Sequence, residues 1–308
     1  MTTGPIVDMH VHVMATSPDP LRDDYEIWEY GDLAGVDQCE APGLIEDVEA
    51  AMARGGADHF VTVNMYVPEV DLALLGESQP GVAIDDLRSQ LPDRLRAFNR
   101  WGLSLAATRR SMTLFAAVDP AVLGGRAGAE HLRWAVEHGA RGVKVHPVAQ
   151  RFHPDDPRMA PIYEVCDETG ITFLSHAGSS RGPVEFAEPA AFAGVASRHP
   201  RMKIVLAHLG GARWEQALEL ARSFPNVYFD LCEIIAWTGA PHAPSRDELA
   251  LLIKEIGSDR VFFGTDYPWY EVDKTVQLVL DLPALSEEER WGILGSNAVT
   301  RLGLPVDL

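Results

Sequence analysis

The amino-acid sequence predicts an α/β protein built as a (β/α)8 TIM-type barrel. Three observations lead to this prediction: eight short apolar runs lie too far apart for hairpins, segments with helical periodicity separate them, and 308 residues suit one such barrel. The main alternative is an open doubly wound sheet, which usually has fewer strands and a Gly-rich phosphate turn after its first strand. No GxGxxG motif follows the first apolar run, so the barrel is favoured.

The candidate strands are rich in β-branched and aromatic residues, and most are nearly continuous in apolar residues, as expected of parallel strands buried on both faces. In chain order they cover residues 6–13, 58–64, 113–119, 142–146, 171–176, 204–208, 227–231 and 260–266. Helical patterns lie between them at residues 44–52, 130–138, 162–169, 190–197, 214–221, 248–256 and 272–280. We expect residues 287–304 to form a helix pair that closes the barrel.

Two longer connections, at about residues 14–41 and 67–86, interrupt the regular alternation. Both follow predicted strands, so we expect them to be lid-like loops over the carboxyl ends of the barrel, where long loops are often functional. No linker rich in Pro, Ser or Gly divides the chain. Residues 1–308 are therefore expected to form a single domain.

Composition excludes several classes of function. The 26 basic against 45 acidic residues give a formal net charge of −19, which argues against nucleic acid or an anionic membrane as a partner. No apolar run approaches the roughly 18 residues needed to span a bilayer, and no secretory signal opens the chain, so a cytoplasmic location is the default expectation. The three cysteines form no CxxC motif, which argues against a disulfide framework and a thiolate zinc site.

The first candidate strand carries His10 and His12 two positions apart. Successive side chains of a strand leave on opposite sides, so both imidazoles, together with Asp8, are expected on one face. At this spacing the two rings are about 7 Å apart and can reach one cation beyond the strand end. On their own they could equally be buried, hydrogen-bonded core histidines, so the rest of the chain must decide.

The positions of later polar residues favour a metal site. Polar residues at or near the carboxyl end of a candidate strand, where the active sites of such barrels are built, are His10, His12, His146, His176, His208 and Asp266. His10, His12 and His176 offer three nitrogens and Asp266 an oxygen, a set that suits zinc or a similar divalent ion. A metal-activated water could then pass its proton to Asp266, with His208 as an acid–base group.

Three further residues are candidates for supporting roles. Asp8 could hold an imidazole or a basic residue from behind the ligands, or form a structural ion pair. Lys144 lies in an apolar strand and needs a partner, because burying it alone is costly. That partner could be a substrate carboxylate, Asp8, or a carbamate group bridging two metals. With His146 and Arg181, we expect Lys144 to bind a small, anionic substrate.

The ordered set of motifs resembles the amidohydrolase superfamily, specifically its amidohydrolase-related branch, over residues 5–304. The motifs are DMHVH at 8–12, GVKVHP at 142–147, SHAG at 175–178, AHLGG at 207–211, GTDYP at 264–268 and NAVTRL at 297–302. That branch includes aminocarboxymuconate-semialdehyde decarboxylase, resorcylate-type decarboxylases and pyrone dicarboxylate lactonase.

The resemblance implies a distorted barrel that binds one divalent metal, Zn²⁺ as the first expectation and Mn²⁺ as the alternative. By motif position, the ligands would be His10, His12, His176 and Asp266, and His208 would be the catalytic histidine. Binuclear relatives use a carbamylated lysine at the end of the fourth strand. In this chain Lys144 lies short of that end, which favours a single metal.

The metal ligands do not separate hydrolases from nonoxidative decarboxylases, and fold analogy cannot choose between them. We expect a hydrolase acting on a small carboxylate-bearing lactone, ester or amide, because Asp266 and His208 provide for water activation most directly. The alternatives are a carboxy-lyase using the same site and a non-catalytic metal-binding barrel. Trp28, Tyr30 and Trp237, expected to be exposed, indicate a pocket or an interface within a homo-oligomer.

Overall fold

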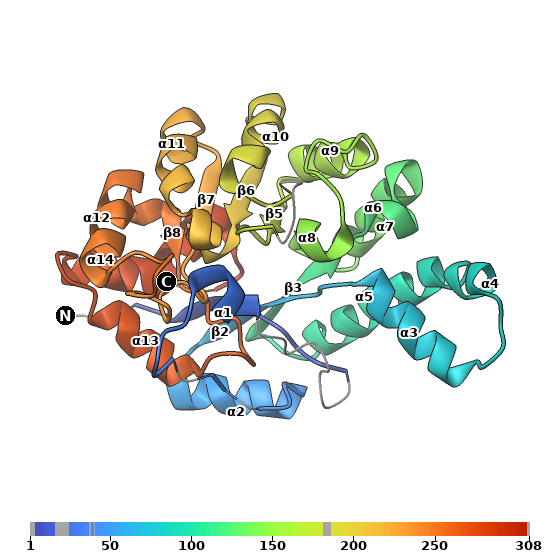
Figure 1. The fold of residues 1–308 in the computed structure, drawn as a ribbon, viewed down its shortest axis with the longest axis horizontal. Coiled ribbons are helices and arrows are strands. Elements are labelled where there is room, and N and C mark those ends of the chain that lie inside the picture. The colour runs from blue at the N-terminus through green and yellow to red at the C-terminus, as the bar shows by residue number, and fades with distance from the viewer. Residues whose placement is uncertain (1–3, 16–24, 37, 40, 181–185, 307–308) are drawn as a thin grey trace.

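Eight parallel strands form one sheet in chain order from β1 to β8 (Figure 1). The computed structural model describes residues 4–15, 25–36, 38–39, 41–180 and 186–306. The strands are β1 (Val7–Val11), β2 (His59–Val63), β3 (Met112–Ala117), β4 (Gly142–Val145), β5 (Thr172–Ser175), β6 (Lys203–Leu206), β7 (Val227–Asp230) and β8 (Val261–Phe262). Each coincides with a predicted strand, and the predicted barrel is confirmed.

Backbone hydrogen bonds between β1 and the chain around β8 bring the two edges of the sheet together. Met9 N donates to Phe263 O at 2.9 Å, and His12 N donates to Tyr267 O at 2.8 Å. In the opposite direction, Asp266 N donates to His10 O at 2.8 Å. The residues that close the barrel are therefore also those that carry the first and last predicted metal ligands.

Helices surround the barrel (Figure 1). Those described are α1 (Tyr25–Tyr30), α2 (Ile45–Gly55), α3 (Pro68–Ser78), α4 (Ile84–Arg88), α5 (Leu91–Ala106), α6 (Pro120–Leu123), α7 (Gly125–Glu137), α8 (Pro147–Gln150), α9 (Ala160–Thr169), α10 (Ala193–Arg198), α11 (Glu215–Ser223), α12 (Arg246–Ile256), α13 (Val272–Leu280) and α14 (Glu287–Trp291). Among the described residues, none of the helices combines the length and apolar character that crossing a bilayer requires.

The long connection after β2 is mostly helical. It contains α3, α4 and α5, for which the sequence analysis predicts no helix, so the expected lid at 67–86 is a helical excursion that extends to one side of the barrel (Figure 1). Of the other expected lid, at 14–41, residues 16–24, 37 and 40 lie outside the described residues. That residues 1–308 form one domain stays a prediction.

Two apolar clusters show which strand side chains face inward. Val7 and Met9 pack with residues of β2, β3 and β8 in a cluster that fills the barrel interior. Val11 and Phe60 belong instead to the large cluster between the strands and the surrounding helices. The side chains of β1 therefore do not alternate strictly between the inside and the outside of the barrel.

A β-bulge in β1 explains this difference. Asp8 pairs with Phe60 and Val11 pairs with Thr62, so three steps on β1 match two steps on β2. The extra residue changes the side of the sheet to which every later side chain of β1 points. His10 and His12 therefore point into the barrel, whereas Asp8, before the bulge, shares the outward register of Phe60.

Two of the three aromatic residues expected at the surface are buried. Tyr30 is 0% and Trp237 2% exposed, and their rings stack with centroids 5.5 Å apart. Only Trp28, at 46%, is exposed. Packing of α1 against the chain that follows β7 covers the other two, and the homo-oligomer stays a prediction.

Candidate metal centre and active site

A cavity of about 430 Å³ opens at the carboxyl ends of the strands. The predicted site residues that line it are His10, His12, Lys144, His146, His176, His208 and Asp266. Asp8 does not line the cavity, and Arg181 lies outside the described residues. Apolar walls are supplied by Met65, Val67, Val148, Ala149 and Trp269.

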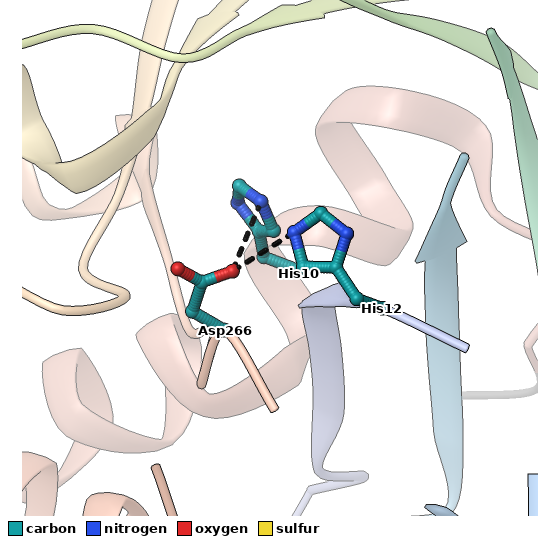
Figure 2. A group of neighbouring side chains, drawn as sticks. All are labelled: His10, His12 and Asp266. Carbon is teal, nitrogen blue, oxygen red and sulfur yellow. Dashed lines mark ion pairs between the residues drawn. The ribbon is translucent and has the colours of Figure 1, made fainter. Parts of the chain in front are cut away.

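His10, His12 and Asp266 converge on one point (Figure 2). Oδ1 of Asp266 lies 3.0 Å from His12 Nε2 and 3.5 Å from His10 Nε2, yet this buried oxygen makes no hydrogen bond within the described chain. Two imidazole nitrogens and a carboxylate oxygen facing a shared point are a donor set that divalent zinc or manganese accepts. These residues therefore fit a metal ion.

Asp230 fixes the orientation of His10. Its Oδ2 lies 3.0 Å from His10 Nδ1, so that nitrogen carries the proton and Nε2 presents its lone pair to the cavity. Asp230 Oδ1 also accepts from the backbone N of His208 and from the Cys232 thiol, at 2.9 and 2.8 Å. The sequence analysis assigned Asp230 no role, although an aspartate ending an apolar strand is a signal that could have found it.

Lys144 is paired with His10, not with Asp8. Its Nζ is 2.8 Å from His10 Nε2, and the side chain is only 2% exposed. Burial lowers the pKa of Lys144 against the opposing effect of the Asp266 charge. The ammonium group and a metal ion would thus compete for the same lone pair of His10.

His208 lies beside the ligand cluster, with its ring centroid 5.5 Å from that of His10, and it contacts His176. His208 Nε2 is 3.0 Å from His176 Nδ1, and the His146 ring stacks on His176 with centroids 3.9 Å apart. His176 is not in the cluster of converging ligand atoms formed by His10, His12 and Asp266. Burial lowers the pKa of His208 to about 4, so its ring is neutral near neutral pH.

The carboxylate of Asp266 is held ionised. Burial alone would raise its pKa, but the neighbouring His10 and His12 rings outweigh burial and lower the pKa. An ionised carboxylate is the form that binds a cation, so Asp266 is suited to hold a metal ion.

Asp8 supports the site from outside it. Its carboxylate accepts from Thr265 Oγ1 at 2.6 Å, from Thr265 N at 3.0 Å and from His10 N at 3.1 Å. Among the described residues these bonds replace the expected contact with an imidazole ring or with Lys144. The bulge in β1 is the reason, because it turns Asp8 away from the face of His10 and His12.

Strained backbone is concentrated at this cavity. His208, Glu233 and Asp266 line it and have φ values of 58°, 63° and 59°, in the left-handed region that non-glycine residues seldom adopt. Each such conformation costs on the order of 1 kcal/mol and persists only where the surroundings hold it in place. The three side chains are therefore aimed by the fold and not by local preference.

A group of buried carboxyl groups forms one wall and was not predicted. Glu26 of α1 and Glu233, which follows β7, both line the cavity, while Glu29 of α1 lies behind them. Burial, together with the charges of Glu29 and Glu26, raises the pKa of Glu233 well above its ordinary value. No local sequence pattern predicts this wall, because two of its members come from a short helix that is far from Glu233 in the sequence.

Comparison with known proteins identifies the family of the chain. A family model described as amidohydrolase matches residues 7–304. The chain belongs to the amidohydrolase family. Together with the fold and the cluster of possible metal ligands, this makes the protein an enzyme of the amidohydrolase superfamily.

This amidohydrolase is similar to named decarboxylases. The 2-amino-3-carboxymuconate-6-semialdehyde decarboxylase of Dictyostelium discoideum is 29% identical over 202 residues, which cover 56% of this chain and 56% of that protein. The match therefore spans little more than half the length of that curated relative.

Solved structures share the fold. The 5-carboxyvanillate decarboxylase of Sphingomonas paucimobilis has a TM-score of 0.66 at 15% identity, covering 97% of this chain and 99% of that one. The dihydroxybenzoic acid decarboxylase of Polaromonas sp. JS666, with bound manganese and 2-nitroresorcinol, has a TM-score of 0.63 at 18% identity, covering 99% and 98%. At these identities the likeness concerns the fold alone.

The prediction of a hydrolase acting on a lactone, ester or amide is wrong in light of these relatives, which are decarboxylases. The physical reason is that both reactions can use the same metal ligands and the same histidine, so the motifs do not encode the choice.

Proposed function

We propose that this amidohydrolase is a metal-dependent, nonoxidative carboxy-lyase that removes CO2 from a small unsaturated or aromatic carboxylate. The observation that carries the proposal is the pairing of a cation site, formed by His10, His12 and Asp266, with a buried acid–base histidine, His208, in one cavity. The decarboxylase relative supports it.

The cation is proposed to be a single divalent ion, Zn²⁺ or Mn²⁺, held by His10, His12 and Asp266, with His176 as the fourth residue. When bound, such an ion supplies positive charge that orients the substrate's oxygen atoms and stabilises the electron density left when CO2 departs. The manganese in the Polaromonas structure makes Mn²⁺ a reasonable alternative to Zn²⁺.

The residues of the chain then perform the proton transfer. His208 takes up a proton from solvent and delivers it to the carbon that bears the carboxylate. The bond between that carbon and the carboxylate breaks, its electron pair returns to the unsaturated system, and CO2 leaves. His176, at 3.0 Å from His208 Nε2, orients the ring, and the apolar walls exclude water from the carbon.

A substrate panel tests this proposal. Metal-loaded protein is given hydroxy- and aminobenzoates and small unsaturated carboxylates on one side, and lactones and amides on the other. We expect CO2 release from at least one carboxylate and no water addition to the second group. Water addition without CO2 release would overturn the proposal.

Two histidine variants test the role of His208 in the same assay. His208→Gln should lower the rate of CO2 release by about 10²–10⁴-fold, the usual contribution of a positioned acid–base group. His242→Gln, which changes an exposed histidine outside the cavity, should behave like the parent protein. Equal activity of the parent and the His208 variant would exclude the role assigned to His208.

A further inference from the structure

We propose that a second cavity, at the amino ends of β3 and β4, binds a small organic molecule that carries a phosphate group. The cavity is separate from the active site, so the inference goes beyond the proposed function and does not depend on it. Three observations carry it: a cluster of arginines, the absence of partners for two of them among the described residues, and the apolar residues beside them.

The second cavity has a volume of about 370 Å³. Its walls come from the last part of α5, the start of β3, the chain around the end of α7, and Pro305. Arg109 and Arg110 precede β3 and Arg141 precedes β4, whereas the active-site cavity opens where the strands end. The two cavities therefore lie at opposite ends of the barrel, and they share no lining residue.

Basic side chains gather in this cavity although the chain as a whole is strongly acidic. They are Arg109, Arg110, Arg141 and His138, and no acidic side chain lines the cavity within the part of the chain that the structure describes. The sequence contains 26 basic and 45 acidic residues, which give a net charge of −19. The charge of this cavity is thus opposite to that of the protein as a whole, and it favours a small anion.

Two of the three arginines have no charged partner in the described chain. Arg109 is engaged, because its Nε donates to Glu49 Oε1 at 2.9 Å. Arg110 and Arg141 are exposed, and the side chain of neither makes an ion pair or a hydrogen bond with another described residue. Two guanidinium groups from different loops therefore keep their donors available, and the planar fork of each can bind two phosphate oxygens.

Helix capping does not account for these arginines. The backbone N–H groups of residues 107–109 bond to carbonyl groups in the last turn of α5, and those of residues 138–140 bond to carbonyl groups in the last turn of α7. Backbone donors thus already satisfy carbonyl groups that a basic side chain would otherwise cap. A ligand gives Arg110 and Arg141 a role that the fold itself does not.

Apolar residues of the cavity indicate that the anion has an organic body. Leu103, Ala106, Met112, Leu114 and Pro305 line the same space as the arginines. A bare inorganic anion would leave this apolar surface in water, whereas an organic group attached to the phosphate would cover it. The volume also lies within the usual range of small-molecule pockets, roughly 300–1,000 Å³.

Isothermal titration calorimetry on the Mn²⁺-loaded protein tests this inference with three probes: adenosine 5′-monophosphate (AMP), adenosine and inorganic phosphate. We expect AMP to bind at least about 10-fold more tightly than either of the other two, because only AMP combines the negative charge with an apolar body. Raising the ionic strength should weaken AMP binding, because salt screens exposed charges.

Variants assign the binding to this cavity. The double variant Arg110→Ala/Arg141→Ala should weaken AMP binding by at least about 10-fold, the effect of losing hydrogen bonds between charged groups. Arg126→Ala is the matched control, because Arg126 is an exposed arginine of α7 that lines neither cavity, and it should leave the affinity unchanged. If the double variant does not fold, as judged by its thermal transition, each single variant is measured instead and should weaken AMP binding.

His12→Ala distinguishes this cavity from the active site, because it removes a proposed metal ligand and should leave AMP affinity unchanged. AMP binding that is lost in His12→Ala and kept in the arginine variant would place the nucleotide in the active site and overturn the inference. Equal affinity for AMP and adenosine, or for AMP and inorganic phosphate, would also overturn it. None of these results depends on CO2 release, so the proposed function is tested separately.

Discussion

At the scale of single residues, the site depends on groups that touch other side chains instead of the reacting atoms. Asp230 is the clearest case, because one carboxylate holds His10 Nδ1 and also the backbone N of His208. The proposed ligand and the proposed acid–base residue are thereby fixed by the same side chain. Neither bond can be inferred from the spacing of residues along the chain.

We predict that Asp230→Asn weakens metal binding by about 10–100-fold, the usual cost of losing a partner that orients a histidine ligand. The reason is that the neutral amide no longer enforces the proton on His10 Nδ1. Competition with a chromophoric chelator measures the affinity. Asp85→Asn, at a side chain that is 88% exposed, is the control, and identical affinities for the two variants would contradict the role of Asp230.

The sequence allowed the polar residues to be found but not all of their orientations. His10, His12, His208 and Asp266 were expected at the carboxyl ends of strands, and they do line one cavity. The predicted direction of the Asp8 side chain was wrong. The sequence alone does not show whether a strand that alternates apolar and polar residues contains an extra residue. A bulge is visible only once the partner strand is known.

At the scale of elements, α1 is tied to two of the loops that shape the cavity. Oε1 of Glu29 accepts from backbone groups that follow β5 and β6, three or four residues after His176 and His208. Gly178 and Gly211 make room for this carboxylate, since a Cβ built on either would lie 2.6 or 2.3 Å from Glu29 Oε1. The helix thus links the two histidine-bearing loops.

We predict that Glu29→Ala lowers the free energy of unfolding by about 2–4 kcal/mol, because two backbone N–H groups lose their buried acceptor. It should also reduce kcat/KM at least about 10-fold, since the loops that carry His176 and His208 lose a shared anchor. Glu29→Gln keeps one acceptor oxygen and should recover most of both quantities. Urea unfolding and steady-state kinetics give the two values, and an alanine variant with parental kinetics would exclude this coupling.

Prediction of the elements was uneven for a physical reason. The eight strands have continuous apolar runs, a strong local signal for parallel strands buried on both faces. The segment that forms α3, α4 and α5 contains Gly, Pro and many charged residues, so its sequence predicts a loop. What stabilises them is packing of Leu75, Leu87 and Leu91 on one another and of α5 on β3, contacts that no short stretch of sequence contains.

At the scale of the whole molecule, the barrel brings together residues from both ends of the chain. β1 and the segment after β8 are hydrogen-bonded neighbours, which places His10 and His12 next to Asp266. The order of motifs along the chain was therefore enough to predict that these three residues meet, whereas His176, the fourth predicted ligand, lies outside their cluster. The acidic wall was not predictable in the same way, because Glu26 and Glu233 belong to no repeating unit of the fold.

The choice of reaction also lies at this largest scale. The same residues at the strand ends could serve hydrolysis or decarboxylation. The two reactions differ in which groups of the cavity give and take protons. Burial lowers the pKa of His208 and raises the pKa of Glu233, which lies beside it in the same cavity. These properties come from burial and from neighbouring charges, which a linear sequence does not display.

The most direct test of a carboxy-lyase is the fate of the proton. The metal-loaded protein is incubated in D2O with whichever carboxylate releases CO2, and the product is analysed by NMR and mass spectrometry. We predict one deuterium on the carbon that carried the carboxylate, and no product from protein stripped of metal by a chelator. A product that has gained the elements of water with its carboxylate intact and no carbon-bound deuterium would contradict the proposed reaction.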